Sequence, residues 1–176
     1  MATRVSSRNP DEVDRLIAAW RRERSDLDVE PMEVLSRVTR LARHLDLARR
    51  TAFAAHGLES WEFDVLSALR RAGRPYELSP GQLIRETMVT SGTMTNRVDR
   101  LTDKGLVDRL PDPDDRRGVL VRLTRRGQSS VDAALEDLLR RERALLKDLS
   151  AAERDRLARL LRVVVGPFDA EQVDAT

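Results

Sequence analysis

Cysteine is absent from this chain of 176 residues, which excludes a disulfide framework and a thiolate metal site. No apolar run approaches the length that crosses a bilayer, and the first ten residues lack the apolar core of a secretory signal. Glycine-rich phosphate loops and nucleophile elbows are also missing, and His44 and His56 stand alone. We therefore expect a soluble, cytoplasmic protein that is not an enzyme and holds no metal or cofactor.

Lysine occurs only twice, at Lys104 and Lys147, so 30 of the 32 basic residues are arginine. Because arginine stays charged to about pH 12, the pI of 9.6 overstates a net charge of only +2, which is weak evidence for a nucleic-acid partner. The distribution is more informative, since residues 116–127 hold five arginines and no acid. A run of like charges is also typical of an ordinary solvated face, so the run alone leaves both interpretations open.

Helical periodicity dominates the chain outside residues 106–124. Apolar spacing predicts a helix over 10–24, a longer one over 31–56 and a third after Gly57. The segment SPGQ (79–82) is a capping box for a short helix. Thr90 or Ser91 caps the next helix, which ends at Gly105. Two further helices are predicted over 125–165.

The period changes to two on either side of the charged segment DPDDRRG (112–118), which predicts a β-hairpin. Two short helices followed by a two-stranded wing make a winged helix-turn-helix, so we predict a mainly α fold with a small β-wing. In this fold the second helix enters the major groove and the wing reaches a neighbouring minor groove.

Polar residues off the buried stripe of helix 91–103, together with the two wing-tip arginines, are therefore candidates for contacts with bases or phosphates. They are Ser91, Thr93, Thr95, Asn96, Arg100, Arg116 and Arg117. Two structural alternatives stay open. The helix residues are also compatible with ordinary surface, and Asp115 can pair with Arg117 simply to hold the turn.

The segment LTDKGLVDRLPDPDDRRGVLVRLTRRG (101–127) resembles the signature of MarR-type transcriptional regulators. Its elements are Leu-x-x-Lys-Gly-Leu-Val, an Asp-x-Arg wing tip at Asp115 and Arg117, and Leu-Thr-x-x-Gly. The similarity in element order covers residues 31–165. It implies a homodimer on a pseudo-palindromic operator in double-stranded DNA. A single domain (1–176) would then comprise an extra N-terminal helix (10–24), dimerisation helices (31–56 and 125–165) and the winged helix-turn-helix (58–124).

The chain is also similar to the urate-responsive branch of that family (the HucR, PecS and MftR types), which carries an extra N-terminal helix. The four positions that this branch uses for ligand response keep their identities here as Trp20, Asp64, Arg97 and Arg109. The resemblance implies a repressor that urate releases from DNA, the urate anion replacing Asp64 as the partner of Arg97 or Arg109. From the residues alone, Trp20 is more typical of a core anchor. Asp64 is equally typical of a surface carboxylate and of a partly buried one that is paired with arginine.

Other functions remain compatible with the sequence. The effector of a MarR-type regulator can be a phenolic compound, an antibiotic or another anion. A winged-helix interaction module or the dimerisation domain of an enzyme would not bind DNA at all. A constitutive architectural DNA-binding protein is disfavoured by the extra helix and its tryptophan.

Overall fold

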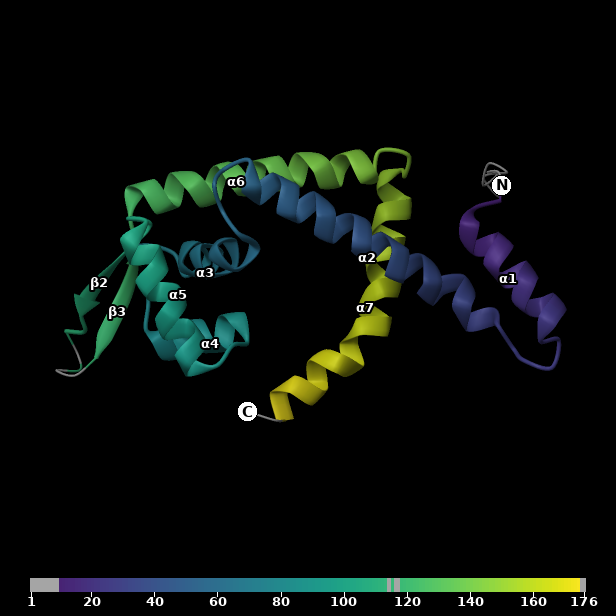
Figure 1. Cartoon of the computed structure of the whole chain (residues 1–176), viewed down its shortest axis with the longest axis horizontal. Helices are drawn as coiled ribbons and strands as arrows, with labels where there is room; N and C mark the ends of the chain where they lie inside the picture. The colour runs from purple at the N-terminus through teal and green to yellow at the C-terminus, as the bar shows by residue number, and fades with distance from the viewer. Residues whose placement is uncertain (1–9, 114, 116–117, 175–176) are drawn as a thin grey trace. The chain divides into compact units, whose positions relative to one another are not determined.

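The chain folds into two compact units that meet in sequence between Arg49 and Arg50. The structure is a computed structural model that describes residues 10–113, 115 and 118–174. The first unit contains α1 (Glu12–Glu23) and most of α2 (Glu30–Ala54). The second unit contains three strands and five further helices, which are α3 (Ser60–Arg71), α4 (Pro80–Thr87), α5 (Ser91–Asp103), α6 (Arg125–Leu145) and α7 (Ala151–Asp174) (Figure 1).

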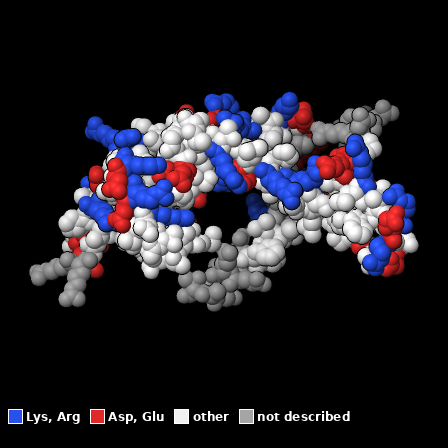
Figure 2. All heavy atoms as spheres, in the orientation of Figure 1, with Lys and Arg blue, Asp and Glu red and all other residues white. Residues whose placement is uncertain are grey.

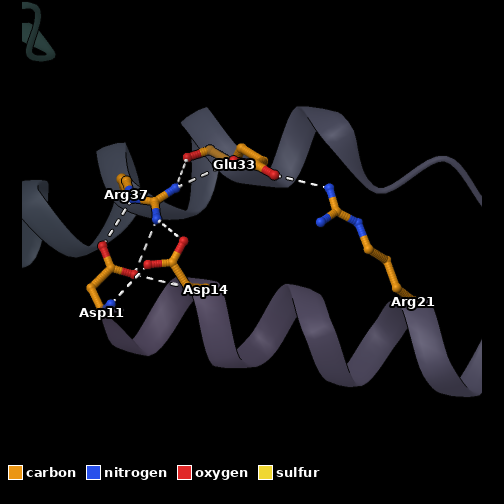
Figure 3. A network of polar contacts seen from close by, with 5 residues as sticks. All are labelled: Asp11, Asp14, Arg21, Glu33 and Arg37. Carbon is orange, nitrogen blue, oxygen red and sulfur yellow. Dashed lines mark hydrogen bonds and ion pairs between the residues drawn. The ribbon is translucent and has the colours of Figure 1, made fainter. Parts of the chain in front are cut away.

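Arg37 of α2 joins the two helices of the first unit. Its guanidinium donates hydrogen bonds to both carboxylate oxygens of Asp11 and, at 2.6 Å, to Asp14 (Figure 3). A second ion pair joins Arg21 to Glu33 at 2.9 Å. Beneath these polar contacts lies a small apolar cluster of buried or partly buried residues, Val13, Ile17, Val29 and Met32. The helix predicted over 10–24 is thus present, and both ion pairs and buried apolar side chains join it to α2.

Asp11 is the N-cap of α1, and its side chain accepts a hydrogen bond from the backbone N–H of Asp14 at 2.9 Å. The backbone N–H of Asp14 and then the Arg37 guanidinium donate to Asp11 and hold the pKa of its carboxyl below the usual value. The contribution of this carboxylate to the stability of the helix pair is therefore present above the usual aspartate pKa. It is lost as the pH falls through the lowered pKa.

We expect Arg37→Met to loosen α1 from α2 at neutral pH, because Asp11 and Asp14 would lose their shared cation. Amide hydrogen exchange measured along the chain should accelerate in α1 and stay unchanged in α3 to α5. Arg15→Met is the matched control, since the exposed Arg15 makes no ion pair with any described residue. Equal exchange in α1 of both variants would show that the apolar cluster alone holds the helix.

The wing is a three-stranded antiparallel sheet in the order β1 (Glu77–Leu78), β3 (Val119–Leu123), β2 (Val107–Pro111). The register pairs Val107 with Leu123 and Pro111 with Val119, which confirms the predicted hairpin. The sequence did not predict β1, because two residues are too short to show a period of two. β1 lies just before α4 and pairs with β3, so it connects the start of α4 to the hairpin.

The core of the second unit lies among α3, α4, α5, α6 and the sheet. Phe53 and Phe63 stack with ring centroids 4.0 Å apart, and Leu66, Leu83 and Met94 are fully buried beside them. Thr90 caps α5 by accepting a hydrogen bond from the backbone of Thr93. Order, capping and burial confirm the predicted winged helix-turn-helix.

Helices α6 and α7, with the residue that ends α6, carry large apolar residues that are each more than a third exposed in the described part of the chain. These are Leu135, Leu139, Leu145, Leu146, Leu157, Leu160, Val163, Val164, Val165 and Phe168. An apolar surface of this extent on two helices is typical of a protein–protein interface.

Candidate nucleic-acid interface and effector site

One face of α5 is buried and the other is polar and exposed. Met94, Val98 and Leu101 bury the inner face at 0–2% exposure. The residues expected to contact DNA from this helix are all exposed; they are Ser91, Thr93, Thr95, Asn96 and Arg100. Three of them also make contacts within the protein: the Thr93 hydroxyl with that of Thr90, the Thr95 hydroxyl with the Ser91 carbonyl, and Arg100 with Glu59. The expected wing-tip contacts Arg116 and Arg117 lie outside the described residues.

Acidic and basic side chains are interspersed over the winged-helix elements on the face drawn in Figure 2. Several of the basic groups are paired within the protein: Arg100 with Glu59 at 2.8 Å, Arg109 with Asp99 at 2.6 Å, and Arg122 with Glu77. The charge available to a phosphate backbone therefore depends on how firmly each arginine is held by its carboxylate.

The four expected effector residues occupy different places. Trp20, 43% exposed, belongs to α1 in the first unit. Asp64 is exposed on α3 and lines a cavity of about 220 Å³ with Arg71, Glu86 and others. Arg109 of β2 lines a second cavity of about 150 Å³ with Pro80, Thr95, Val98 and Val119.

The expected pairing of Asp64 with Arg97 or Arg109 is absent from the ion pairs of the described residues. Arg109 is instead satisfied by Asp99, which projects from α5 itself. The expectation of Asp64 came from the positions of the family resemblance, whereas Arg109 of β2 pairs with a carboxylate of α5. Because Asp64 is exposed, water solvates its carboxylate and no ionic partner is needed.

Arg97 is held by an aromatic ring rather than a carboxylate. Its guanidinium lies 5.5 Å from the ring centroid of Trp61, and that of Arg100 lies 4.8 Å from the same ring. The indole N–H of Trp61 donates to Glu59 at 2.8 Å. This hydrogen bond and the nearby charge of Arg100 lower the pKa of the Glu59 carboxyl.

Sequence reasoning missed three residues of this region: Glu59, Trp61 and Glu62. Glu62 is a carboxylate at 0% exposure whose Oε1 lies 2.6 Å from the Lys104 ammonium. The spacing of Glu59 and Glu62 at the start of an apolar stripe is the available signal, because it fits the first turn of a helix.

No group of three or more potential metal ligands gathers among the described residues. Within the same part of the chain, no helix is both long enough and apolar enough to cross a membrane.

A helix pair with a capped, outward-facing second helix and an adjoining wing is the arrangement that helix-turn-helix regulators of transcription use to bind DNA. The model of the MarR family matches residues 56–118. The chain is 39% identical over 150 residues to the HTH-type transcriptional regulator PecS of Dickeya dadantii, covering 85% of this chain and 90% of that protein. The chain belongs to the MarR family.

Two further comparisons agree. The HTH-type transcriptional repressor NicR of Pseudomonas putida is 33% identical over 143 residues, covering 79% of this chain and 89% of NicR. A mutant MarR from Escherichia coli, solved in complex with operator DNA, superposes with a TM-score of 0.62 at 30% identity. That match covers 79% of this chain and 99% of the MarR chain. The protein is thus a regulator of transcription and not an enzyme.

Proposed function

We propose that the protein is a homodimeric repressor that binds a pseudo-palindromic operator and is released from it by urate or a related anionic purine. The observation that carries the effector is the joint presence of Trp20, Asp64, Arg97 and Arg109, combined with the cavity beside Arg109. Membership of the MarR family supports the DNA-binding part.

DNA contact is assigned to the exposed face of α5 and to the wing. Asn96 presents an amide, which pairs with adenine edges in the major groove, and the threonine hydroxyls can accept or donate to bases and phosphates. Arg116 and Arg117 are proposed to enter the adjacent minor groove, where the potential favours arginine. Half-sites are then expected about one helical turn apart.

The partner subunit is assigned to the apolar faces of α6 and α7. Leu157, Leu160 and Val164 repeat at helical spacing and remain 37–57% exposed, and a second copy would remove them from water. Dimerisation also supplies the two recognition helices that a palindrome requires. The single-domain organisation predicted from sequence, with outer dimerisation helices, is retained as part of this proposal.

The effector is assigned to the cavity beside Arg109. Urate is a planar monoanion at neutral pH, and arginine binds such anions through paired hydrogen bonds. We propose that urate replaces Asp99 as the partner of Arg109. Because Asp99 belongs to α5, the exchange frees the recognition helix, which supplies the difference in affinity between two conformations that a ligand needs. Trp20, Asp64 and Arg97 are proposed to complete the response.

Urate at millimolar concentration should release the protein from operator DNA, and Arg109→Gln should require at least about tenfold more urate because a charged hydrogen bond is lost. Asp64→Asn, which keeps shape and removes charge, should also blunt the response. Asp64→Asn should bind DNA without urate about as tightly as the parent, whereas Arg109→Gln also loses the pair with Asp99 and should bind it more weakly. Fluorescence anisotropy of labelled operator measures release directly.

A phenol and an antibiotic belong in the same titration as alternative effectors. Release by one of these compounds and not by urate would show that the effector belongs to a different chemical class. Release by none, with operator binding intact, would remove the effector assignment and leave the repressor.

A further inference from the structure

The first turn of α3 holds the recognition helix by three side chains. Glu59, Trp61 and Glu62 project from this turn, and each contacts a residue of α5 or its C-cap. We call these three residues the α3 mount. The backbone of α5 packs chiefly against α4 and β2, so the mount is a separate attachment made through long side chains.

Glu62 makes the buried part of the mount. Its side chain is fully buried; Oε2 accepts the backbone N–H of Glu59 at 2.9 Å, while Oε1 lies 2.6 Å from the Nζ of Lys104. Oε1 accepts no hydrogen bond from the described residues, and the Lys104 ammonium is its ion-pair partner among them. A buried carboxylate is costly to leave without its cation, which favours keeping the partly exposed Lys104 ammonium beside Glu62.

The two charges also sit at favourable helix ends. Glu62 lies in the first turn of α3, where the helix dipole is positive, and Lys104 is the C-cap of α5, where the dipole is negative. The left-handed Gly105 follows directly (φ +66°) and turns the chain toward the wing. The pair therefore fixes the point at which the recognition helix ends and the wing begins.

The half-buried Trp61 and the exposed Glu59 make the outer part of the mount. The Trp61 ring carries Arg97 and Arg100, which are one turn apart on α5. Glu59 accepts from the Trp61 indole at one oxygen and from Arg100 at the other, both at 2.8 Å. A planar guanidinium on an aromatic face with a carboxylate at its edge has few orientations left.

We propose that Glu62 is a positioning residue for operator recognition. By holding Lys104 it sets the angle of α5, and with Trp61 and Glu59 it fixes the side chains of that helix before DNA arrives. The inference rests on the proposed operator binding. Its chemistry differs from that of the effector cavity, because no residue of the mount lines that cavity.

The test uses a duplex selected by the wild-type chain from a random pool, together with a scrambled duplex of the same composition. Glu62→Gln keeps the side-chain shape and removes the charge. This change should lower the affinity for the selected duplex about tenfold, because α5 would no longer be aligned with the base edges that it contacts. The scrambled-duplex affinity and the salt slope should stay unchanged, because no phosphate contact is lost. Glu86→Gln is the control, since it removes an equal charge from an exposed pair with Arg71.

Positioning is separated from stability by a double-mutant cycle with Lys104→Met. This change strands the Glu62 carboxylate and should lower the melting temperature most. Glu62→Gln/Lys104→Met buries no charge and should recover most of the melting temperature while the selected-duplex affinity stays low. The double variant also carries the test if either single variant fails to fold.

Trp61 gives a signal that does not depend on DNA. In a Trp20→Phe background it is the one remaining tryptophan, and Glu62→Gln should shift its emission while Glu86→Gln should not. Recovery of selected-duplex affinity together with stability in the double variant, or an unmoved Trp61 emission, would overturn the inference. A random pool that yields no preferred duplex would instead overturn the proposed operator binding.

Discussion

Replacing Gly127 with alanine should destabilise the second unit by about 3 kcal/mol, at the upper end of what overpacking costs. A Cβ at this position would lie 2.1 Å from the carbonyl oxygen of Leu106 and 2.9 Å from Cδ1 of Leu123. The carbonyl belongs to the backbone between α5 and the wing, so it cannot turn aside as a flexible side chain would. Helix α6 would have to move as a whole.

The local hydrogen bonds explain why this approach is so close. Thr124 caps α6 by accepting from the Gly127 N–H at 3.0 Å, and its own hydroxyl lies within hydrogen-bonding distance of the Gly105 and Leu106 carbonyls. The backbone N–H of Thr124 donates to Leu106 as well. The start of α6 is thus fastened to the backbone that follows α5, and only a glycine leaves room for the contact.

Gly81→Ala is the matched control for this prediction. Position 81 is an exposed helical glycine where a Cβ would meet nothing closer than 3.9 Å, so its effect should be neutral or a gain of up to about 1 kcal/mol from helix propensity. Chemical denaturation of both variants gives the comparison. A Gly127→Ala loss no larger than that of the control would mean that α6 and Leu106 do not meet as described.

The second large effect should come from Asn96→Ala, which leaves the fold intact and weakens operator binding. Loss of a paired contact with one base costs about 1–3 kcal/mol, or roughly fivefold to more than a hundredfold in affinity. The side chain is exposed and lies off the face buried by Met94 and Val98, so the melting temperature should not change. The salt slope should also persist because asparagine carries no charge.

Thr102→Ala is the control from the same helix. The Thr102 hydroxyl donates to the Val98 carbonyl at 2.8 Å in the last turn, far from the N-terminal residues that recognition helices use for base contacts. Operator affinity should stay within about twofold of wild type, with any change confined to stability. Equal losses in both variants would remove Asn96 from the base-reading residues.

Much of the fold could be predicted because its signals are local. Ser79 and Thr124 each cap a helix as their sequence context indicates, and Gly105 takes the left-handed conformation that ends α5. The alternation of apolar residues gave the β2–β3 hairpin. The extra strand β1 could not be predicted, because its two residues form a strand only by pairing with β3, which is distant in the sequence.

The candidate site could be predicted only in part. The exposure of Thr95 and Asn96 follows from the helical period, since both lie away from the buried stripe. The partners of charged residues do not follow, because any of several arginines could satisfy a given carboxylate. Asp99, rather than Asp64, pairs with Arg109. Glu62 is buried, although a charged side chain is normally expected to be exposed.

The most direct test of the regulator is a titration of the wild-type chain against its selected duplex and the scrambled duplex, with stoichiometry from sedimentation. The account predicts one dimer for each selected duplex, an affinity at least about 10³-fold higher than for the scrambled duplex, and a marked weakening with salt. Equal affinities for the two duplexes, or a chain that binds and sediments as a monomer, would contradict it.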